Sequence, residues 1–197
     1  MYIGLDLGTS GLKGIVIDDA QNICAEASFP LNVERPKNSW VEQDPNDWIL
    51  ATEDVMASLS VQVKLDQVKA IGLSGQMHGA TILDQNGNVL RPCILWNDTR
   101  SFEEASYLDS KAIFRDLTGN IVFPGFTAPK IAWIKKHEPK IFDQISKVLL
   151  PKDYLRFWLS GEYVAEMSDA AGTSWLDVKK RDWSDDLLAA TGLDRNQ

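Results

Sequence analysis

The 197-residue sequence lacks several features that would place it in a membrane or nucleic-acid-binding class. No apolar run approaches the roughly 18 residues that a membrane helix needs, and the N-terminus lacks the basic and apolar segments of a signal peptide. Positive charge is scarce, since 20 Lys and Arg stand against 28 Asp and Glu, a formal net charge of -8. We therefore expect a cytoplasmic protein with neither a nucleic acid nor a membrane as partner.

Cysteine is also scarce, and only Cys24 and Cys93 occur. They lie far apart in apolar segments without a CxxC pair or a neighbouring histidine, so neither a disulfide framework nor a zinc site has support. We expect both to be small buried hydrophobic residues. Two nucleotide-binding signatures are missing as well. There is no GxxxxGK[ST] and no strand-linked GxGxxG, so a phosphate would have to be bound by another kind of turn.

The residues that are present favour a globular α/β domain, with 44% hydrophobic and 24% charged residues. The N-terminal segment predicts an antiparallel meander with short turns, its strands covering residues 2–7, 12–17 and 23–29. Asp44-Pro45 predicts the N-cap and first residue of a helix over 45–59. An apolar run at 68–73 then predicts a strand that returns parallel to a neighbour through a right-handed crossover. The expected fold is a mixed sheet with an antiparallel three-strand start and flanking helices.

The remaining segments are expected to be mostly helical. Asn86-Gly87 predicts a hairpin between strands at 80–83 and 89–95. Further helices are expected at 101–109, 111–117, 128–136 and 152–159, with a strand at 148–150. The tail from 177 to 197 begins another helical segment and stops without a recognisable terminal element. We therefore expect the chain to be part of a longer protein.

The first candidate site contains Asp6, a carboxylate amid apolar residues of a strand expected to be covered by helices. Burying it unpaired is costly, and a facing cation would offset that cost. The turn 8–11 offers backbone N–H groups and hydroxyls to an anion, and a lysine follows. The candidate phosphate-binding residues are Gly8, Thr9, Ser10 and Lys13. A glycine-rich hairpin whose N–H groups satisfy Asp6 explains the same residues equally well.

A second candidate site is the segment 74–79, which follows the predicted parallel strand and sets polar residues between glycines. Open α/β sheets bind ligands at such strand ends. Gln76 and His78 can form hydrogen bonds with hydroxyl groups while Met77 covers an apolar ring or carbon chain. The alternative is a turn around a core histidine whose hydrogen bonds are satisfied within the protein.

The third candidate site follows the strand that ends near Trp96. Indole faces stack on sugar C–H groups, and the amide, carboxylate and guanidinium groups of residues 97–100 can fix hydroxyls. Asp98 can equally cap the following helix and pair with Arg100. Phe126, in the segment 123–130, could line the same pocket or belong to a loop that leads into a helix.

Together these motifs resemble a known family. Residues 2–13 (YIGLDLGTSGLK) are similar to the first phosphate loop of sugar kinases in the actin, hexokinase and Hsp70 superfamily. The segments 74–79 and 96–100 resemble the xylulokinase branch of the FGGY carbohydrate kinases, and SGQMHG is the part that points to xylulose. The resemblance covers essentially all of the sequence, including the segments 40–45, 124–130, 150–155 and 168–172.

The resemblance implies a ribonuclease H-like (actin-like ATPase) domain and a set of roles. Asp6 would hold Mg²⁺ through water, and Thr9, Ser10 and Lys13 would face the γ-phosphate of ATP. Met77 and His78 would bind a ketopentose, with the sugar pocket completed by Trp96, Asp98 and, more weakly, Phe126. The family is much longer, however. Its catalytic base, an aspartate, and its adenine-binding region belong to segments beyond residue 197.

These expectations identify residues 1–197 as most or all of the N-terminal sugar-binding domain of such a kinase, without the C-terminal nucleotide-binding domain. The implied reaction is ATP-dependent phosphorylation of D-xylulose by the parent enzyme, for which a homodimer is a candidate state, while the fragment alone is expected to be inactive. Alternatives are a kinase for another pentulose or polyol and a non-catalytic sugar-binding module. A nuclease with the same core is disfavoured because the net charge is negative and the segment 74–79 would have no role.

Overall fold

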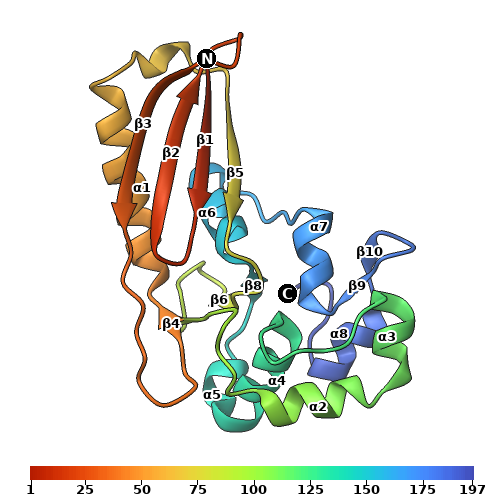
Figure 1. Ribbon diagram of the computed structural model, residues 1–197. Coiled ribbons are helices and arrows are strands. Elements are labelled where there is room, and N and C mark those ends of the chain that lie inside the picture. The colour runs from red at the N-terminus through yellow and green to blue at the C-terminus, as the bar shows by residue number, and fades with distance from the viewer.

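A four-stranded sheet with strand order β3-β2-β1-β5 forms one half of the computed structural model, which describes residues 1–197 (Figure 1). Its strands are β1 (Tyr2–Leu7), β2 (Gly11–Ile17), β3 (Ile23–Pro30) and β5 (Ala70–Gly75). β1 pairs antiparallel with β2 and parallel with β5, and β2 pairs antiparallel with β3. The predicted antiparallel start and parallel return are confirmed.

Two helices cover one face of this sheet. α1 (Pro45–Ser60) begins where predicted, because the Asp44 side chain accepts a hydrogen bond from the backbone of Asn46 and proline follows the cap. It packs so closely on β2 that a Cβ on Gly14 would overlap the side chain of Val55. α6 (Pro151–Ser160) contacts both α1 and β5. The alternate residues Ile3, Leu5 and Leu7 of β1 are buried in the core on this face.

The opposite face of the sheet is open to solvent at Tyr2, Asp6 and Lys13. The expectation that Asp6 lies in a strand covered by helices is therefore wrong for its own side of the strand. Successive side chains of a strand point to opposite faces, so the apolar residues on either side of Asp6 turn toward α1 and Asp6 turns away. No burial cost has to be offset at this carboxylate.

The other half of the fold is mainly helical (Figure 1). Its helices are α2 (Phe102–Asp109), α3 (Ala112–Thr118), α4 (Thr127–His137), α5 (Pro139–Phe142) and α8 (Asp185–Thr191). They enclose a second apolar core that includes Phe114, Ile131 and Leu187. The helices expected at 101–109, 111–117 and 128–136 are confirmed to within two residues at each end, and that at 152–159 corresponds to α6, followed by Gly161 at a φ of 73°.

Short strands join the two halves. β6 (Thr81–Leu83) pairs with β8 (Lys147–Leu149), and β7 (Cys93–Ile94) pairs with β4 (Glu42–Gln43). Along residues 93–95 the side chains alternate between the cores. Cys93 and Leu95 belong to the core beneath the sheet, whereas Ile94 belongs to the helical core. These strands are therefore a wall shared by both cores.

The predicted hairpin around Asn86-Gly87 is only partly right. The turn is present, since Asp84 donates to the carbonyl of Asn88 at 2.9 Å and Gly87 has a φ of 81°. A continuous strand over 89–95 is wrong, however. Val89 forms a single bridge with Leu83, and Pro92 has no N–H for a ladder, so the regular partner of β6 is β8.

Other expectations also need correction. Before α8, the tail contains a small hairpin instead of a helix, formed by β9 (Leu176–Asp177) and β10 (Asp182–Trp183). Short turns of helix were not expected, namely η1 (Leu65–Gln67), α7 (Met167–Ala170) and η2 (Ala171–Thr173). Cys93 is buried as expected, but Cys24 is exposed because it lies on β3, an edge strand. None of the helices is both long and apolar enough to span a bilayer.

Candidate active site

Two of the predicted motifs lie side by side because β1 and β5 are parallel neighbours. Leu7 pairs with Gly75, so the turn 8–11 and the loop 76–79 leave the same edge of the sheet. The backbone N–H of Gln76 donates to the Leu7 carbonyl at 2.7 Å. Carboxyl ends of parallel strands are the usual ligand-binding edge of open α/β sheets. The candidate phosphate turn and the candidate sugar loop therefore meet at one place.

Glycine makes the phosphate turn compact. Gly8 N donates to the Gly11 carbonyl at 3.0 Å, and a Cβ on Gly11 would come within 2.8 Å of the Phe29 carbonyl oxygen. Only a residue without a side chain permits so close an approach between neighbouring backbones. Thr9 and Ser10 carry their hydroxyls at the tip of this turn. The turn thus keeps its backbone accessible to a small anion such as a phosphate group.

Asp6 and Lys13 are direct cross-strand partners on the open face of the sheet, next to this turn. Asp6 accepts no hydrogen bond from the turn, so the arrangement in which the turn satisfies its carboxylate is not formed. Lys13 Nζ lies 3.2 Å from Glu26 Oε2 in an exposed pair, which holds it only weakly. Both charged groups are therefore available to a ligand.

No cluster of three or more His, Cys, Asp or Glu side chains that could enclose a metal ion is present. A divalent cation at this edge would have to be held by Asp6 together with water and phosphate oxygens. Mg²⁺ commonly binds in that way, through one or two carboxylates and substrate phosphates with several retained waters. The open carboxylate beside the glycine turn fits this mode of binding.

Hydrogen bonds between side chains connect the turn to the loop. Thr9 Oγ1 donates to Gln76 Oε1 at 3.0 Å and accepts from Trp96 Nε1 at 3.0 Å. Gln76 Nε2 donates to Gln43 Oε1 at 2.8 Å. Gln76 is buried, and its amide oxygen and nitrogen both have protein partners. Each of these atoms keeps one further hydrogen-bonding position, so Gln76 links the turn to the loop, and its contact with a substrate stays a prediction.

Gln43 is the residue of this network that the sequence did not single out. Its Nε2 donates to the carbonyls of Thr9 and Asn32 at 2.7 and 2.9 Å. Its Oε1 accepts from Gln76 and, at 3.1 Å, from Trp48 Nε1. All four hydrogen-bonding positions of the amide are thus used. Its place in the segment 40–45, part of the family resemblance, was the only signal in the sequence.

His78 lies in a tightly defined pocket. Its ring centroid is 4.6 Å from that of Phe126, and a Cβ on Gly172 would overlap the imidazole. Burial, reinforced by the Lys130 ammonium, lowers the pKa of His78 to about 4, so the ring is neutral near pH 7. Its Nδ1 is buried without a hydrogen-bond partner. This nitrogen packs against Gly172, whereas the residue as a whole is partly exposed, so a ligand hydroxyl could form a hydrogen bond only with the accessible part of the neutral ring.

Apolar surface accompanies these polar groups. Met77 and Trp96 are 44% and 43% exposed, although Trp96 follows the buried residues of β7. Gly125 packs directly against the Trp96 backbone, because a Cβ at position 125 would overlap the Trp96 carbonyl oxygen. Phe126 is buried against the His78 ring. The structure thus brings Phe126 to His78 and links Trp96 to the phosphate turn, while the sugar-binding roles of these residues stay predictions.

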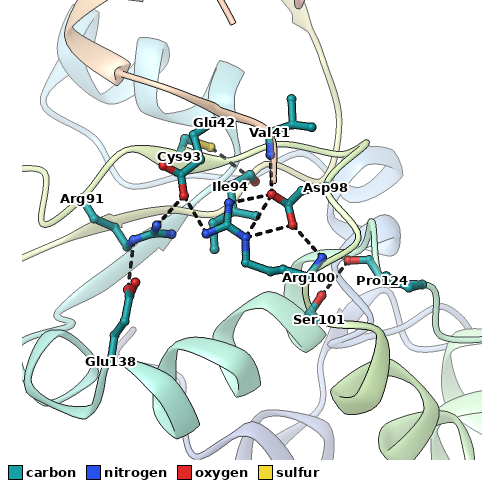
Figure 2. Close-up of polar contacts among 10 residues, drawn as sticks. All are labelled: Val41, Glu42, Arg91, Cys93, Ile94, Asp98, Arg100, Ser101, Pro124 and Glu138. Carbon is teal, nitrogen blue, oxygen red and sulfur yellow. Dashed lines mark hydrogen bonds and ion pairs between the residues drawn. The ribbon is translucent and has the colours of Figure 1, made fainter. Parts of the chain in front are cut away.

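Asp98 is placed differently from these residues. Figure 2 shows it inside a network of ion pairs and hydrogen bonds, fully buried, where it accepts from Val41 N at 2.6 Å and from the Arg100 guanidinium. Arg100 also pairs with Glu42 at 2.6 Å. The expected Asp98–Arg100 pair is therefore formed. The helix cap is not, because α2 begins after Ser101 and Asp98 bonds to the backbone of Arg100 instead.

The network extends across the back of the site. Arg91 joins Glu42 to Glu138 through contacts of 2.6 and 3.0 Å, and the Arg100 guanidinium lies 3.7 Å from the ring centroid of Trp40. Glu42 lies on β4 and Trp40 lies just before it. Arg91 precedes β7, Arg100 precedes α2, and Glu138 follows α4. The network therefore fixes the base of the loop that carries Trp96. Asp98 has its oxygens occupied there, so its contribution to ligand binding, which stays a prediction, would be through the position of this loop.

Comparisons with known proteins agree with this geometry. Residues 1–197 match the N-terminal domain of the FGGY family of carbohydrate kinases. This chain belongs to that family. A curated xylulose kinase of Escherichia coli is 54% identical over 198 residues, which cover 100% of this chain and 41% of that protein. The corresponding protein of Klebsiella pneumoniae is 53% identical over 197 residues, with the same coverage.

Solved FGGY structures have the same fold. A crystal structure described as a xyloylose kinase from Brucella ovis superposes with a TM-score of 0.98 at 57% identity, covering 100% of this chain and 42% of that one. The xylulose kinase from Rhodospirillum rubrum gives 0.94 at 30% identity, covering 98% and 42%. The actin-like ATPase fold expected from the resemblance is thereby confirmed. The chain spans about two fifths of the length of these relatives.

Proposed function

We propose that the complete protein containing this chain is a kinase that phosphorylates D-xylulose with ATP. In this reaction the C5 hydroxyl attacks the γ-phosphorus, a new O–P bond forms and the bond to ADP breaks. The hydroxyl proton passes to a base, and the products are xylulose 5-phosphate and ADP. The observation that carries the proposal is the junction of the glycine turn 8–11 and the loop 76–79, in a chain this similar to xylulose kinases.

The phosphate end of the reaction would lie at Asp6 and the turn. Mg²⁺ would neutralise charge that develops on the transferring phosphate, and Asp6 would orient the hydrated ion. Thr9 and Ser10 would bind phosphate oxygens through their backbone N–H groups, with the Ser10 hydroxyl and the Lys13 ammonium as further donors, while Gly8 would keep the turn compact. Since these groups are fixed in advance by the short turn, little reorganisation would be needed at the moment of transfer.

The sugar end would lie at Met77, His78 and Trp96, with Phe126 behind the histidine. Neutral His78 would form a hydrogen bond with a ketose hydroxyl, while the Met77 thioether and the Trp96 indole would cover C–H groups of the sugar. The Thr9–Gln76 bond would hold this end at a fixed distance from the phosphate end. Such positioning is the main source of rate enhancement in phosphoryl transfer.

The test is steady-state turnover of the complete protein with Mg-ATP and a panel of pentuloses and polyols. We expect the highest kcat/KM for D-xylulose. A higher kcat/KM for another pentulose or polyol would support the kinase activity but would replace D-xylulose as the proposed substrate. Sugar binding without ATP turnover would instead indicate a non-catalytic module.

The isolated 197-residue chain serves as a matched sample in the same assay. We expect it to be inactive, because the proposed base and nucleotide-binding domain belong to the rest of the protein. Loss of a general base alone typically lowers a rate by about 10²- to 10⁴-fold. A cytoplasmic location and a homodimer are further parts of the proposal, which fractionation and sedimentation would test.

A further inference from the structure

Lys130 is a fully buried lysine for which the proposed reaction has no direct use. It belongs to the first turns of α4, and its side chain is 0% exposed. Lysine is almost never fully buried unless it is paired, yet no carboxylate lies within ion-pair distance of Lys130. Its Nζ instead donates to the backbone carbonyl of His78 at 2.8 Å. The buried amine of Lys130 therefore forms its hydrogen bond with one carbonyl oxygen in the candidate sugar loop.

The same oxygen has a second donor on the same helix. Thr127 Oγ1, one turn earlier in α4, donates to the His78 carbonyl at 3.2 Å. His78 needs such support because its φ is 65°, in the region that side chains other than glycine rarely adopt. Gly79 N donates to the Met77 carbonyl at 2.9 Å, so His78 is the central residue of a γ-turn with positive φ, a strained type.

The start of α4 therefore contacts both the ring and the backbone carbonyl of His78. Phe126, immediately before Thr127, packs on the ring, while Thr127 and Lys130 bind the carbonyl. The direction of the ring depends on the backbone torsions of its own residue, and the ring fills the space that a side chain on Gly172 would occupy. A relaxed turn at His78 would consequently move the imidazole out of the position it holds between Phe126 and Gly172.

We infer that Lys130, assisted by Thr127, is a positioning residue that holds the strained turn at His78 and so directs the imidazole toward the sugar. The inference rests on the proposed function for the identity of the sugar, but its structural part does not. Lys130 has no exposed surface with which to touch a ligand, and it acts through the carbonyl. Burial lowers the pKa of Lys130 to about 7, and the amine donates to a carbonyl in either protonation state.

The experiment compares variants of the complete protein. K130M keeps the length and apolar stem but removes the donor, and T127V removes the second donor with little change of shape. K135M is the matched control, because Lys135 is an exposed lysine on the same helix. We expect K130M to raise the KM for D-xylulose about tenfold, the upper scale of one lost hydrogen bond, with the KM for ATP little changed.

We expect T127V to cause a smaller rise in the same KM, and T127S, which keeps the hydroxyl, to lie closer to wild type. Melting temperature separates positioning from packing. K130M should melt no lower than wild type, because an isosteric apolar chain replaces a buried amine. A K130M protein with a lowered melting temperature and an unchanged KM for D-xylulose would overturn the inference. If K130M fails to fold, T127V with a wild-type KM would overturn it equally.

A second readout does not depend on turnover. Crystal structures of K130M and of the K130M/T127V double variant should show His78 with a negative φ or a displaced ring, whereas K135M should keep the φ of wild type. An unchanged His78 in the double variant would refute the inference. A wild-type protein that does not phosphorylate D-xylulose would refute the proposed function alone, and the crystal structures would still decide the role of Lys130.

Discussion

Gln76 Nε2 donates a hydrogen bond to Gln43 Oε1 at 2.8 Å, and both amides are buried. Through this bond the loop that carries His78 is connected to β4, while the bond from Gln43 Nε2 to the Thr9 carbonyl holds the phosphate turn. One buried amide therefore sets the spacing between the two parts of the candidate site. The relationship makes the site sensitive to a residue that lies behind both predicted motifs.

The first prediction concerns this amide. Gln43→Glu replaces Nε2 by an oxygen that would face the carbonyls of Thr9 and Asn32, so two donors are lost and repulsion is introduced. We expect a stability loss of about 2–4 kcal/mol, since each unsatisfied buried polar group costs roughly 1–3 kcal/mol. The KM for D-xylulose and the KM for ATP should both rise. Chemical denaturation and kinetics check this, with Gln62→Glu on the exposed surface as the control, and equal stability of the two variants would contradict it.

Asp6 gives a second prediction, because it is exposed and has no hydrogen bond to lose. Asp6→Asn in the complete protein should lower kcat strongly and leave D-xylulose binding nearly intact, since the charge matters most when the phosphate is transferred. The unfolding midpoint should stay close to that of wild type. Calorimetric titration with the sugar and a Mg²⁺ series in the kinetic assay measure both quantities. A normal kcat with only a raised sugar KM would place Asp6 outside the metal site.

The third prediction distinguishes a ligand contact from a packing role at His78. His78→Ala should raise the KM for D-xylulose and reduce its preference over the deoxy analogue that lacks the contacted hydroxyl. The reason is that a site built around a hydroxyl loses affinity when either partner is removed, by roughly 1–3 kcal/mol. The KM for ATP should change little. Kinetics with a deoxy-sugar series test this, and unchanged sugar selectivity in a destabilised variant would argue for packing alone.

A pH dependence of stability follows from the same residue. The pKa of His78 is lowered by burial and by Lys130 from 6.5 to about 4, with only Asp169 and the Gly172 backbone acting in the other direction. As pH falls below 6.5, the unfolded chain takes up the proton before the folded one. The stability advantage of wild type over His78→Ala should therefore shrink between pH 6.5 and about 4. Denaturation curves for both proteins across this range measure it, and a constant difference would contradict it.

Gly172 supplies the fifth prediction. Its missing side chain leaves room for the His78 ring, so Gly172→Ala would push the imidazole aside. We expect a raised KM for D-xylulose, together with a moderate loss of stability of about 1–3 kcal/mol from overpacking. Gly72→Ala is the matched control, because only one atom, the Ile3 carbonyl oxygen at 3.9 Å, lies near its Cβ position. Equal sugar KM values in the two variants would show that the ring tolerates the methyl group.

The sequence was informative where a signal is local. β1, β2 and β3 and the start of α1 follow from alternation, short turns and Asp44-Pro45, and they were predicted to within a residue or two. Local reasoning failed at residues 89–95, because the pairing of β7 with β4 is decided by a segment about fifty residues earlier in the chain. It failed at Asp6 because helices cover only one face of the sheet.

The same distinction holds within the site. Glycine turns and polar residues after strands pointed to the turn and the loop, and the parallel pairing of β1 with β5 brings these together. Gln43 and Lys130 could not be singled out, since a glutamine and a lysine are ordinary surface residues in a sequence. Both side chains are buried and form hydrogen bonds with groups far away in the chain, which only the folded structure reveals.

The wall of short strands has a consequence for how the molecule responds to stress. Cys93, Ile94 and Leu95 follow one another along the chain but pack alternately into two different cores. Neither core can open without removing a neighbour from the other, because adjacent residues cannot separate. The sheet half and the helical half are therefore mechanically coupled, and the chain should lose its structure in one cooperative step rather than half by half. Any bending that accompanies the binding of a ligand has to occur outside this wall.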